Sequence, residues 1–173
     1  DYFQSSLFTI ARRRILWLLI LVLANGLTTK VIAMNDQILK EIVLLAAFIP
    51  LLIGTGGNVG AQSSTVVIRG LSTQKLKSLG AFKAVIKEAI TGALLGILMK
   101  LVVFPFAWWQ GEGPLIASAV GISLISITTL AATAGAILPL LFDKMGLDPA
   151  LMSSPFITTV TDIAGVFIYL STA

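Results

Sequence analysis

Leu147–Ala173, which reads LDPALMSSPFITTVTDIAGVFIYLSTA, is an apolar segment long enough to cross a lipid bilayer, and its interior holds one carboxylate, Asp162. In a helix, the rise from Ala150 to Asp162 is about 18 Å, which places the carboxylate near the middle of a hydrocarbon core about 30 Å thick. A carboxylate at that depth costs at least about 2.5–3.5 kcal/mol unless it faces water, a cation or a polar partner. We therefore interpret Asp162 first as a functional group.

One helical face carries the polar and small residues of this segment, because its members are spaced i, i+4, i+8 and i+11: Ser154, Thr158, Asp162 and Gly165. Pro155 has no N–H, so we expect a backbone carbonyl in the preceding turn to lack its helical donor. Carboxylate, hydroxyl and carbonyl oxygens are hard ligands that suit Mg²⁺ or Ca²⁺ rather than soft metals. The structural alternative is a buried aspartate that bonds a threonine or lysine on another span.

The composition of the whole chain indicates an all-α integral membrane protein. Of its 173 residues, 57% are hydrophobic and only 12% are charged, whereas soluble domains carry about 25% charged residues. The chain contains neither Cys nor His, which excludes thiolate and imidazole metal sites and Cys–His or Ser–His catalysis, so we expect no enzyme. The net charge of +4 does not indicate a nucleic-acid partner, because the basic residues lie in predicted loops.

Hydrophobic segments predict five transmembrane helices, which the length allows at about 20 residues each. They cover about Ile15–Ile32, Ile38–Gly70, Ala84–Trp108, Leu115–Phe142 and the segment that ends at Ala173. Three arginines precede the first span, and the loop between the second and third spans is strongly basic. Because cytoplasmic loops are enriched in Lys and Arg, we expect a cytoplasmic N-terminus, an outside C-terminus and a multi-pass location in the cell (plasma or inner) membrane.

The second predicted span is longer than one crossing needs, and Pro50 and a glycine-rich stretch from Gly54 to Gly60 interrupt it. Glycines let a backbone approach another helix or an ion closely, and they permit breaks. One helical face also carries a polar stripe, which consists of Thr55, Asn58, Gln62, Thr65 and Arg69. Together these features indicate a water-lined path. The alternative is ordinary packing of small residues between helices.

The third and fourth spans carry weaker signals. Gly92 and Gly96 form a GxxxG pair, which is typical of helix packing but has a high false-positive rate. Ser126, Thr129 and Thr133 share one face of the fourth span, and their hydroxyls either pack or face the same path as Asp162.

Two segments together carry a resemblance to a known family: GTGGNVGAQS at Gly54–Ser63 and PFITTVTDIAG at Pro155–Gly165. In this order they resemble the MgtE magnesium channels and the related animal solute carriers, and the five predicted spans fit that family. The resemblance covers the whole chain. It implies Mg²⁺ influx through the central pore of a homodimer, lined by the second and fifth spans of both subunits, with a largely hydrated ion that is both transported and pore-bound.

The resemblance also implies roles for residues that face the metal. Asp162 matches the pore acid, and Thr158 matches the position whose backbone carbonyl faces the ion. The glycine-rich wall opposite is matched by Gly54, Gly57 and Asn58.

Two further features are compared with the family. Some relatives carry an amide where this chain has Ala61, so water or Gln62 must replace that contact here. The family has cytoplasmic Mg²⁺-sensing domains before the first span. Residues 1–14 resemble the end of the helix that connects them, and residues 15–173 resemble the five-helix transmembrane pore domain.

The chemistry of the ion agrees with a hydrated path. Mg²⁺ gives up water reluctantly, and one aspartate per chain cannot build a dehydrated cage, whereas two Asp162 side chains across a two-fold axis could hold the ion through its waters. An ion-coupled secondary transporter of divalent cations, with Asp162 as a protonatable site, is the second hypothesis. An assembly subunit without transport is the third, and an intramembrane enzyme is the last. Membrane lipids are expected partners, and other divalent cations are further candidate substrates.

Overall fold

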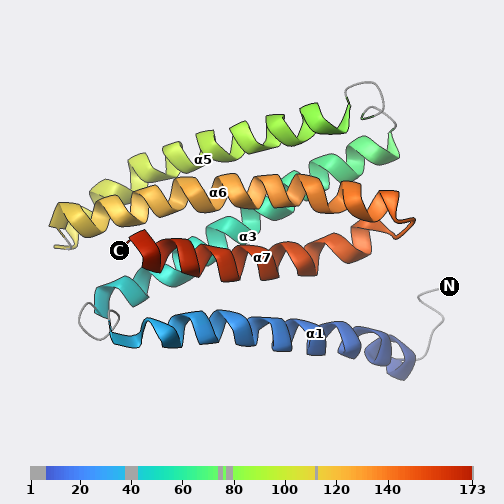
Figure 1. Cartoon of the computed structure of the whole chain (residues 1–173), viewed down its shortest axis with the longest axis horizontal. Coiled ribbons are helices and arrows are strands. Elements are labelled where there is room, and N and C mark those ends of the chain that lie inside the picture. The colour runs from blue at the N-terminus through green and yellow to red at the C-terminus, as the bar shows by residue number, and fades with distance from the viewer. Residues whose placement is uncertain (1–6, 38–42, 74–75, 77–79, 112, 173) are drawn as a thin grey trace.

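The computed structural model of the protein describes residues 7–37, 43–73, 76, 80–111 and 113–172, and these residues form helices joined by short turns. The long helices are α1 (Leu7–Met34), α3 (Val43–Ser72), α5 (Ala81–Trp109), α6 (Gly113–Lys144) and α7 (Pro149–Thr172). Successive helices run in opposite directions, so α1 begins at the end of the molecule opposite to the end where α7 stops (Figure 1). The predicted all-α class is confirmed.

Four helices are long and apolar enough to cross a membrane within the described ranges: Leu45–Ser72, Ala81–Trp109, Gly113–Lys144 and Pro155–Thr172. Among the described residues of α1, the apolar segment Leu18–Met34 is shorter than these four. Four of the predicted spans are therefore helices of sufficient length and hydrophobicity to cross a membrane, and the count of five spans stays a prediction. The predicted domain boundary after residue 14 lies inside the continuous helix α1.

The predicted interruption of the second span is wrong for the described residues, because α3 runs from Val43 to Ser72 as one helix. Pro50 lies inside it without a break, and the glycine-rich stretch is helical throughout. A helix tolerates a proline by giving up one hydrogen bond and bending slightly. The predicted start of this span, residues 38–42, lies outside the described ranges.

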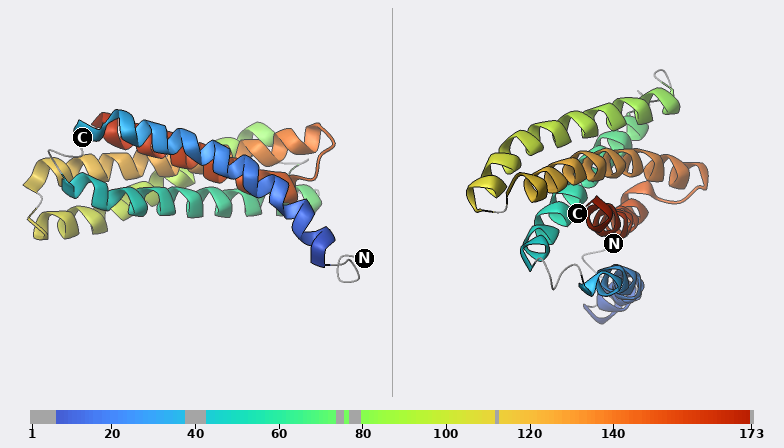
Figure 2. Two further views of the ribbon diagram at one scale, coloured as in Figure 1. Left: turned by 90° about the horizontal axis from the view of Figure 1, so that it is seen from below. Right: turned by 60° about the vertical axis from the view of Figure 1, so that its left-hand side comes forward.

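Helix α6 lies at the centre of the bundle and packs against α5, α3 and α7 (Figure 1). Its buried positions are rich in small residues, including Ala117, Ala131, Ala132, Gly135 and Ala136. Small side chains let helix backbones approach closely, which is how helices associate where lipid supplies no hydrophobic drive. Helix α1 contacts α7 and lies apart from α5 and α6 (Figure 2).

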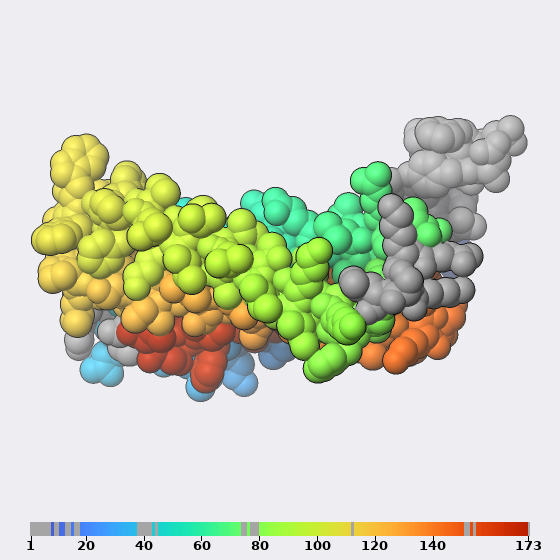
Figure 3. All heavy atoms as spheres, turned by 90° about the horizontal axis from the view of Figure 1, so that it is seen from above, coloured from blue at the N-terminus to red at the C-terminus, as the bar shows by residue number. Residues whose placement is uncertain are grey.

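The predicted GxxxG pair packs α5 onto α6. A Cβ atom at Gly92 would meet the Ala132 methyl group at 2.6 Å, and one at Gly96 would meet Ile125 Cα at 2.5 Å. Both glycines are buried, so the helix-packing interpretation is confirmed. The opposite side of α5 is exposed and apolar, with Leu94, Leu98 and Val102 among its residues, and α5 covers much of the face that Figure 3 shows.

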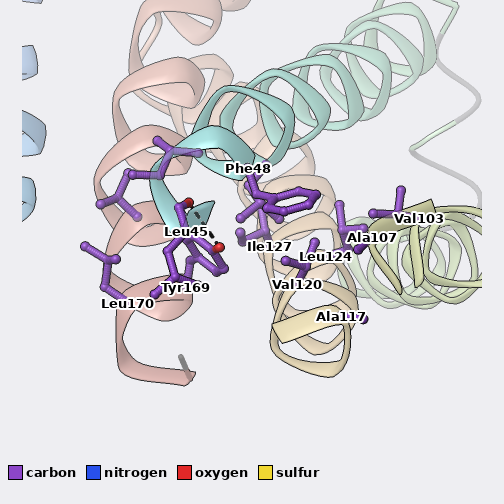
Figure 4. Close-up of a cluster of buried hydrophobic side chains, with 13 residues drawn as sticks. Leu45, Phe48, Val103, Ala107, Ala117, Val120, Leu124, Ile127, Tyr169 and Leu170 are labelled. Atoms are coloured by element: carbon purple, nitrogen blue, oxygen red, sulfur yellow. Dashed lines mark hydrogen bonds between the residues drawn. The ribbon is translucent and has the colours of Figure 1, made fainter. Parts of the chain in front are cut away.

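The larger hydrophobic cluster joins α3, α5, α6 and α7 toward the end of the bundle where α7 stops (Figure 4). Phe48 of α3 and Ile127 of α6 are buried there beside Tyr169 of α7. The Tyr169 hydroxyl donates a hydrogen bond of 3.1 Å to the backbone carbonyl of Leu45, which satisfies the phenol inside an apolar region. This cluster fixes α3 against α7 on one side of the candidate site.

Candidate functional site

The two motifs singled out in the sequence cross each other where α3 passes α7. A Cβ atom at Gly56 would lie 3.7 Å from Thr161 Cβ, and one at Gly60 would lie 2.5 Å from a methyl group of Ile157. The backbone of α3 therefore lies directly against α7 at this crossing. Because Gly57 follows Gly56 and Asp162 follows Thr161, the crossing brings the glycine-rich segment and the carboxylate to the same depth in the bundle.

The glycines of α3 divide into two sets. Gly56 and Gly60 are buried, and a methyl group on either would collide with a neighbouring helix. At Gly54 and Gly57, an added methyl group would meet no neighbouring atom of the same subunit within 4 Å. The alternative of small-residue packing therefore explains the first set, but it does not explain the second.

The polar stripe lies on the uncovered side of α3. Four of its five residues are exposed, and Thr55 is half-buried. Gly54 and Ala61 are exposed on the same side of the helix. Within a membrane protein, an amide, a hydroxyl and a guanidinium along one uncovered helical face need water or a second protein surface.

Pro50 leaves one backbone carbonyl of α3 without its helical donor, which was not expected from the sequence. Proline has no N–H, so it cannot supply the helical donor for the carbonyl of Ala46 four residues earlier. Ala46, Pro50, Gly54 and Asn58 are spaced four residues apart, and all four are exposed.

Asp162 is half-buried on α7. Across the described ranges, no hydrogen bond or ion pair joins its carboxylate to another side chain or to the backbone. The structural alternative required a threonine or lysine partner on another span, and the described residues supply none. The carboxylate is thus left to water, a cation or a second subunit.

Thr158 lies one turn before Asp162 and is also half-buried. Its hydroxyl donates to the carbonyl of Pro155 at 3.0 Å, and the hydroxyl of Thr159 donates to the same oxygen at 2.9 Å. The buried Thr161 hydroxyl lies 2.9 Å from the Ile157 carbonyl and 3.0 Å from the Thr158 carbonyl. These side chains therefore bond their own helix and rigidify the turn that holds Asp162.

Other residues that the sequence grouped with Asp162 do not contribute to the candidate site in the described part of the structure. Gly165 is buried, and a methyl group there would lie 3.6 Å from the Ile127 side chain, so it serves helix packing rather than an open face. The side chain of Ser154 lies outside the described part. Three hydroxyls of α6 donate to carbonyls of their own helix, at 3.1 Å for Ser126, 2.6 Å for Thr129 and 2.6 Å for Thr133.

The donor set determines what this site can hold. The described residues contain no group of three Asp, Glu, His or Cys side chains that could ligate a metal directly. A single carboxylate is instead suited to a hydrated hard cation, whose waters bond the carboxylate oxygens.

The sequence is similar to a known family of divalent cation transporters and to three curated magnesium transporters. A family profile described as "MgtE: Divalent cation transporter" matches residues 49–172. The chain is 39% identical over 160 residues to the magnesium transporter MgtE of Thermus thermophilus, an alignment that covers 92% of this chain and 35% of that relative. It is 35% identical over 164 residues to the magnesium transporter MgtE of Enterococcus faecalis, covering 94% of this chain and 36% of that protein. With the magnesium transporter MgtE of Bacillus subtilis it shares 33% identity over 172 residues, covering 99% of this chain and 38% of the relative. The chain thus spans little more than a third of the length of the curated relatives it matches.

Proposed function

The chain belongs to the MgtE family of divalent cation transporters, and from this membership we propose that it is a magnesium channel domain that mediates Mg²⁺ influx through a pore at a homodimer interface. It is an integral membrane protein with at least four apolar helices of spanning length in its described part. In this proposal residues 15–173 form the pore domain, and residues 1–14 are the end of a cytoplasmic connecting helix.

The observation that carries the proposal is the half-buried Asp162, which has no bonded partner among the described residues and lies at the crossing of the two motifs. On α3, the polar stripe next to this crossing is uncovered. Neither surface is stable against lipid tails, because each exposes charged or polar groups at membrane depth. A second copy of the chain, with water between the two polar faces, satisfies both surfaces.

In this pore, two Asp162 carboxylates face each other across the two-fold axis and attract a hydrated Mg²⁺. Asn58 and the carbonyl of Thr158 bond waters of the ion, and the open Gly54 and Gly57 leave the space that a hydrated ion requires. Ala61 supplies no donor, so water occupies its place. Holding the ion through its water is strong enough to recruit it and weak enough to release it, which conduction requires.

The distribution of basic residues supports an orientation in the membrane. Arg69, Lys83, Lys87 and Lys144 all lie near helix ends on the side of the bundle where α1 begins (Figure 1). Since Lys and Arg mark the cytoplasmic side, we place this end, with the N-terminus, in the cytoplasm and the C-terminus outside the cell membrane.

The alternative is an ion-coupled secondary transporter of divalent cations in which Asp162 exchanges a proton. The same partnerless carboxylate favours it, because an intramembrane acid is also typical of proton relays. The two functions differ in their driving force. Flux through a channel follows the membrane potential and the Mg²⁺ gradient, whereas coupled transport also follows a pH gradient.

The test is Mg²⁺ influx into liposomes that contain the purified protein, with Asp162→Ala as the variant. We expect influx that follows the membrane potential, does not respond to a pH gradient and falls to near background in the variant. Influx that a pH gradient drives would favour the transporter instead. Equal influx in the parent and the variant would remove Asp162 from either mechanism.

A further inference from the structure

A groove lies between the end of α3 and the start of α5. Both helices pack on α6, but they hardly touch each other, which leaves a slot between them. The slot has a volume of about 160 Å³ and is lined by Val66, Val67, Gly70, Leu76, Ala84, Lys87 and Glu88. Its position at the ends of two membrane helices places it near a boundary between lipid and water.

The chemistry of this groove is apolar inside and cationic at its mouth. Val66, Val67 and Ala84 supply an apolar wall, of which Val66 is largely exposed. Lys87 lines the groove, and the exposed Lys83 lies one turn earlier on the same face of α5. The lining contains one carboxylate, Glu88, so the two lysines leave an excess of positive charge at the mouth of the groove.

The groove is separate from the candidate ion path. Val67 is buried and lies on the side of α3 away from Asn58, since the two are nine residues, or 2.5 helical turns, apart. The exposed Val66 lies one turn after Gln62 of the polar stripe, so one edge of the groove borders that stripe, and the groove extends away from it toward α5. An apolar slot open to lipid in a membrane protein is filled by an acyl chain or a neighbouring helix.

We propose that this groove binds one anionic phospholipid, with part of an acyl chain along Val66 and Ala84 and the phosphate beside Lys87. Basic pockets between transmembrane helices bind anionic headgroups, and each Lys or Arg near the surface strengthens that attraction. The excess of positive charge selects a lipid with a net negative headgroup over a zwitterionic one. The inference does not depend on the proposed ion conduction.

The experiment measures lipid adducts on the purified protein by native mass spectrometry, with phosphatidylglycerol and phosphatidylcholine as the two probes. We expect one tightly bound phosphatidylglycerol, and about fivefold weaker binding in Lys87→Gln. Lys144→Gln is the matched control, because it removes one positive charge from the same end of the bundle, outside the groove. Val66→Phe, which fills the slot without changing any charge, should also weaken the adduct.

Several results would overturn the proposal. Equal binding of the two lipids would show that charge does not select the occupant. If Lys87→Gln and Lys144→Gln weakened phosphatidylglycerol binding equally, general attraction to a basic surface would explain the binding. If Val66→Phe left the adduct unchanged, or instead altered the ratio of monomer to dimer, the slot would not be a lipid site. Ion flux is measured in parallel, and its loss or retention leaves these outcomes unaffected.

Discussion

Gly60 on α3 and Gly135 on α6 pack backbone to backbone, because a Cβ atom on Gly135 would collide with the carbonyl oxygen of Gly60. The contact holds α3 against α6 at the same glycine that meets Ile157 of α7. Three residues before Gly60, Gly57 has open space where its side chain would be. Within one short segment, Gly60 therefore packs two helices together, whereas Gly57 leaves open space beside α3. Substitutions can test these two roles separately.

Gly135→Ala should destabilise the fold. The added methyl group meets backbone atoms, which cannot rotate away, so the helices must move apart at a cost of about 1–3 kcal/mol or more. The measurement is the midpoint of thermal unfolding in detergent. Gly57→Ala is the control and should leave the midpoint unchanged or slightly raised, since alanine favours helix over glycine. An equal midpoint for both variants would contradict this packing.

Gly57→Ala should nevertheless lower Mg²⁺ influx by at least about fivefold, equivalent to about 1 kcal/mol. A methyl group that meets nothing in its own subunit would project toward the proposed path and take space from the hydrated ion. Influx into liposomes is compared at equal protein content and equal thermal stability. Normal influx in this variant would place Gly57 outside the path.

Sequence patterns predicted the helices well because each span is a long apolar segment bounded by charged or turn residues. Ala84–Trp108 was predicted where the structure has Ala81–Trp109, and Leu115–Phe142 where it has Gly113–Lys144. Pro50 and the glycines were expected to interrupt the second span, but α3 is continuous because neighbouring helices stabilise it despite one missing hydrogen bond. The helix propensities of the residues do not include this stabilisation by packing against other helices.

The candidate site was predicted only in part. Periodicity placed Thr158, Asp162 and Gly165 on one face, but the wide face of α7 contacts several neighbours, and Gly165 packs against α6. Spacing alone also could not separate the packing glycines from Gly54 and Gly57, because all belong to one motif. Only the crossing of α3 with α7 shows which of them a neighbour covers.

The proposed orientation predicts which ends of the helices are accessible from each side. The chain has no cysteine, so a single introduced thiol reports its own position. Thr73→Cys, at the exposed end of α3, should react with a membrane-impermeant reagent only from the cytoplasmic side, and Gln110→Cys only from outside. Labelling of both thiols from the same side would exclude an antiparallel crossing by α5.

The proposed dimer predicts that exposed residues of the polar face meet their own copies. Ala61→Cys lies on that face and should form a disulfide-linked dimer on mild oxidation in membranes. Leu98→Cys, on the exposed apolar side of α5, is the control and should remain monomeric on a denaturing gel. If the control cross-links as efficiently as Ala61→Cys, random collision explains both, and the interface lies elsewhere.

Asp162→Asn tests the charge on which the proposed path depends. The amide keeps the shape of the side chain but removes the negative charge that attracts a hydrated divalent cation, so Mg²⁺ influx should fall at least about tenfold, or about 1.4 kcal/mol. Asp148→Asn is the matched control, because Asp148 is exposed and accepts a hydrogen bond of 2.9 Å from the Ala150 N–H at the start of α7. Asparagine preserves that cap, so the control should conduct normally. The two variants are compared in liposomes at equal protein content.

Since the carboxylate of Asp162 has no partner among the described residues, its neutralisation should not lower the thermal midpoint, and reduced influx then reports lost attraction for the ion. Undiminished influx in Asp162→Asn would show that this carboxylate does not face the path.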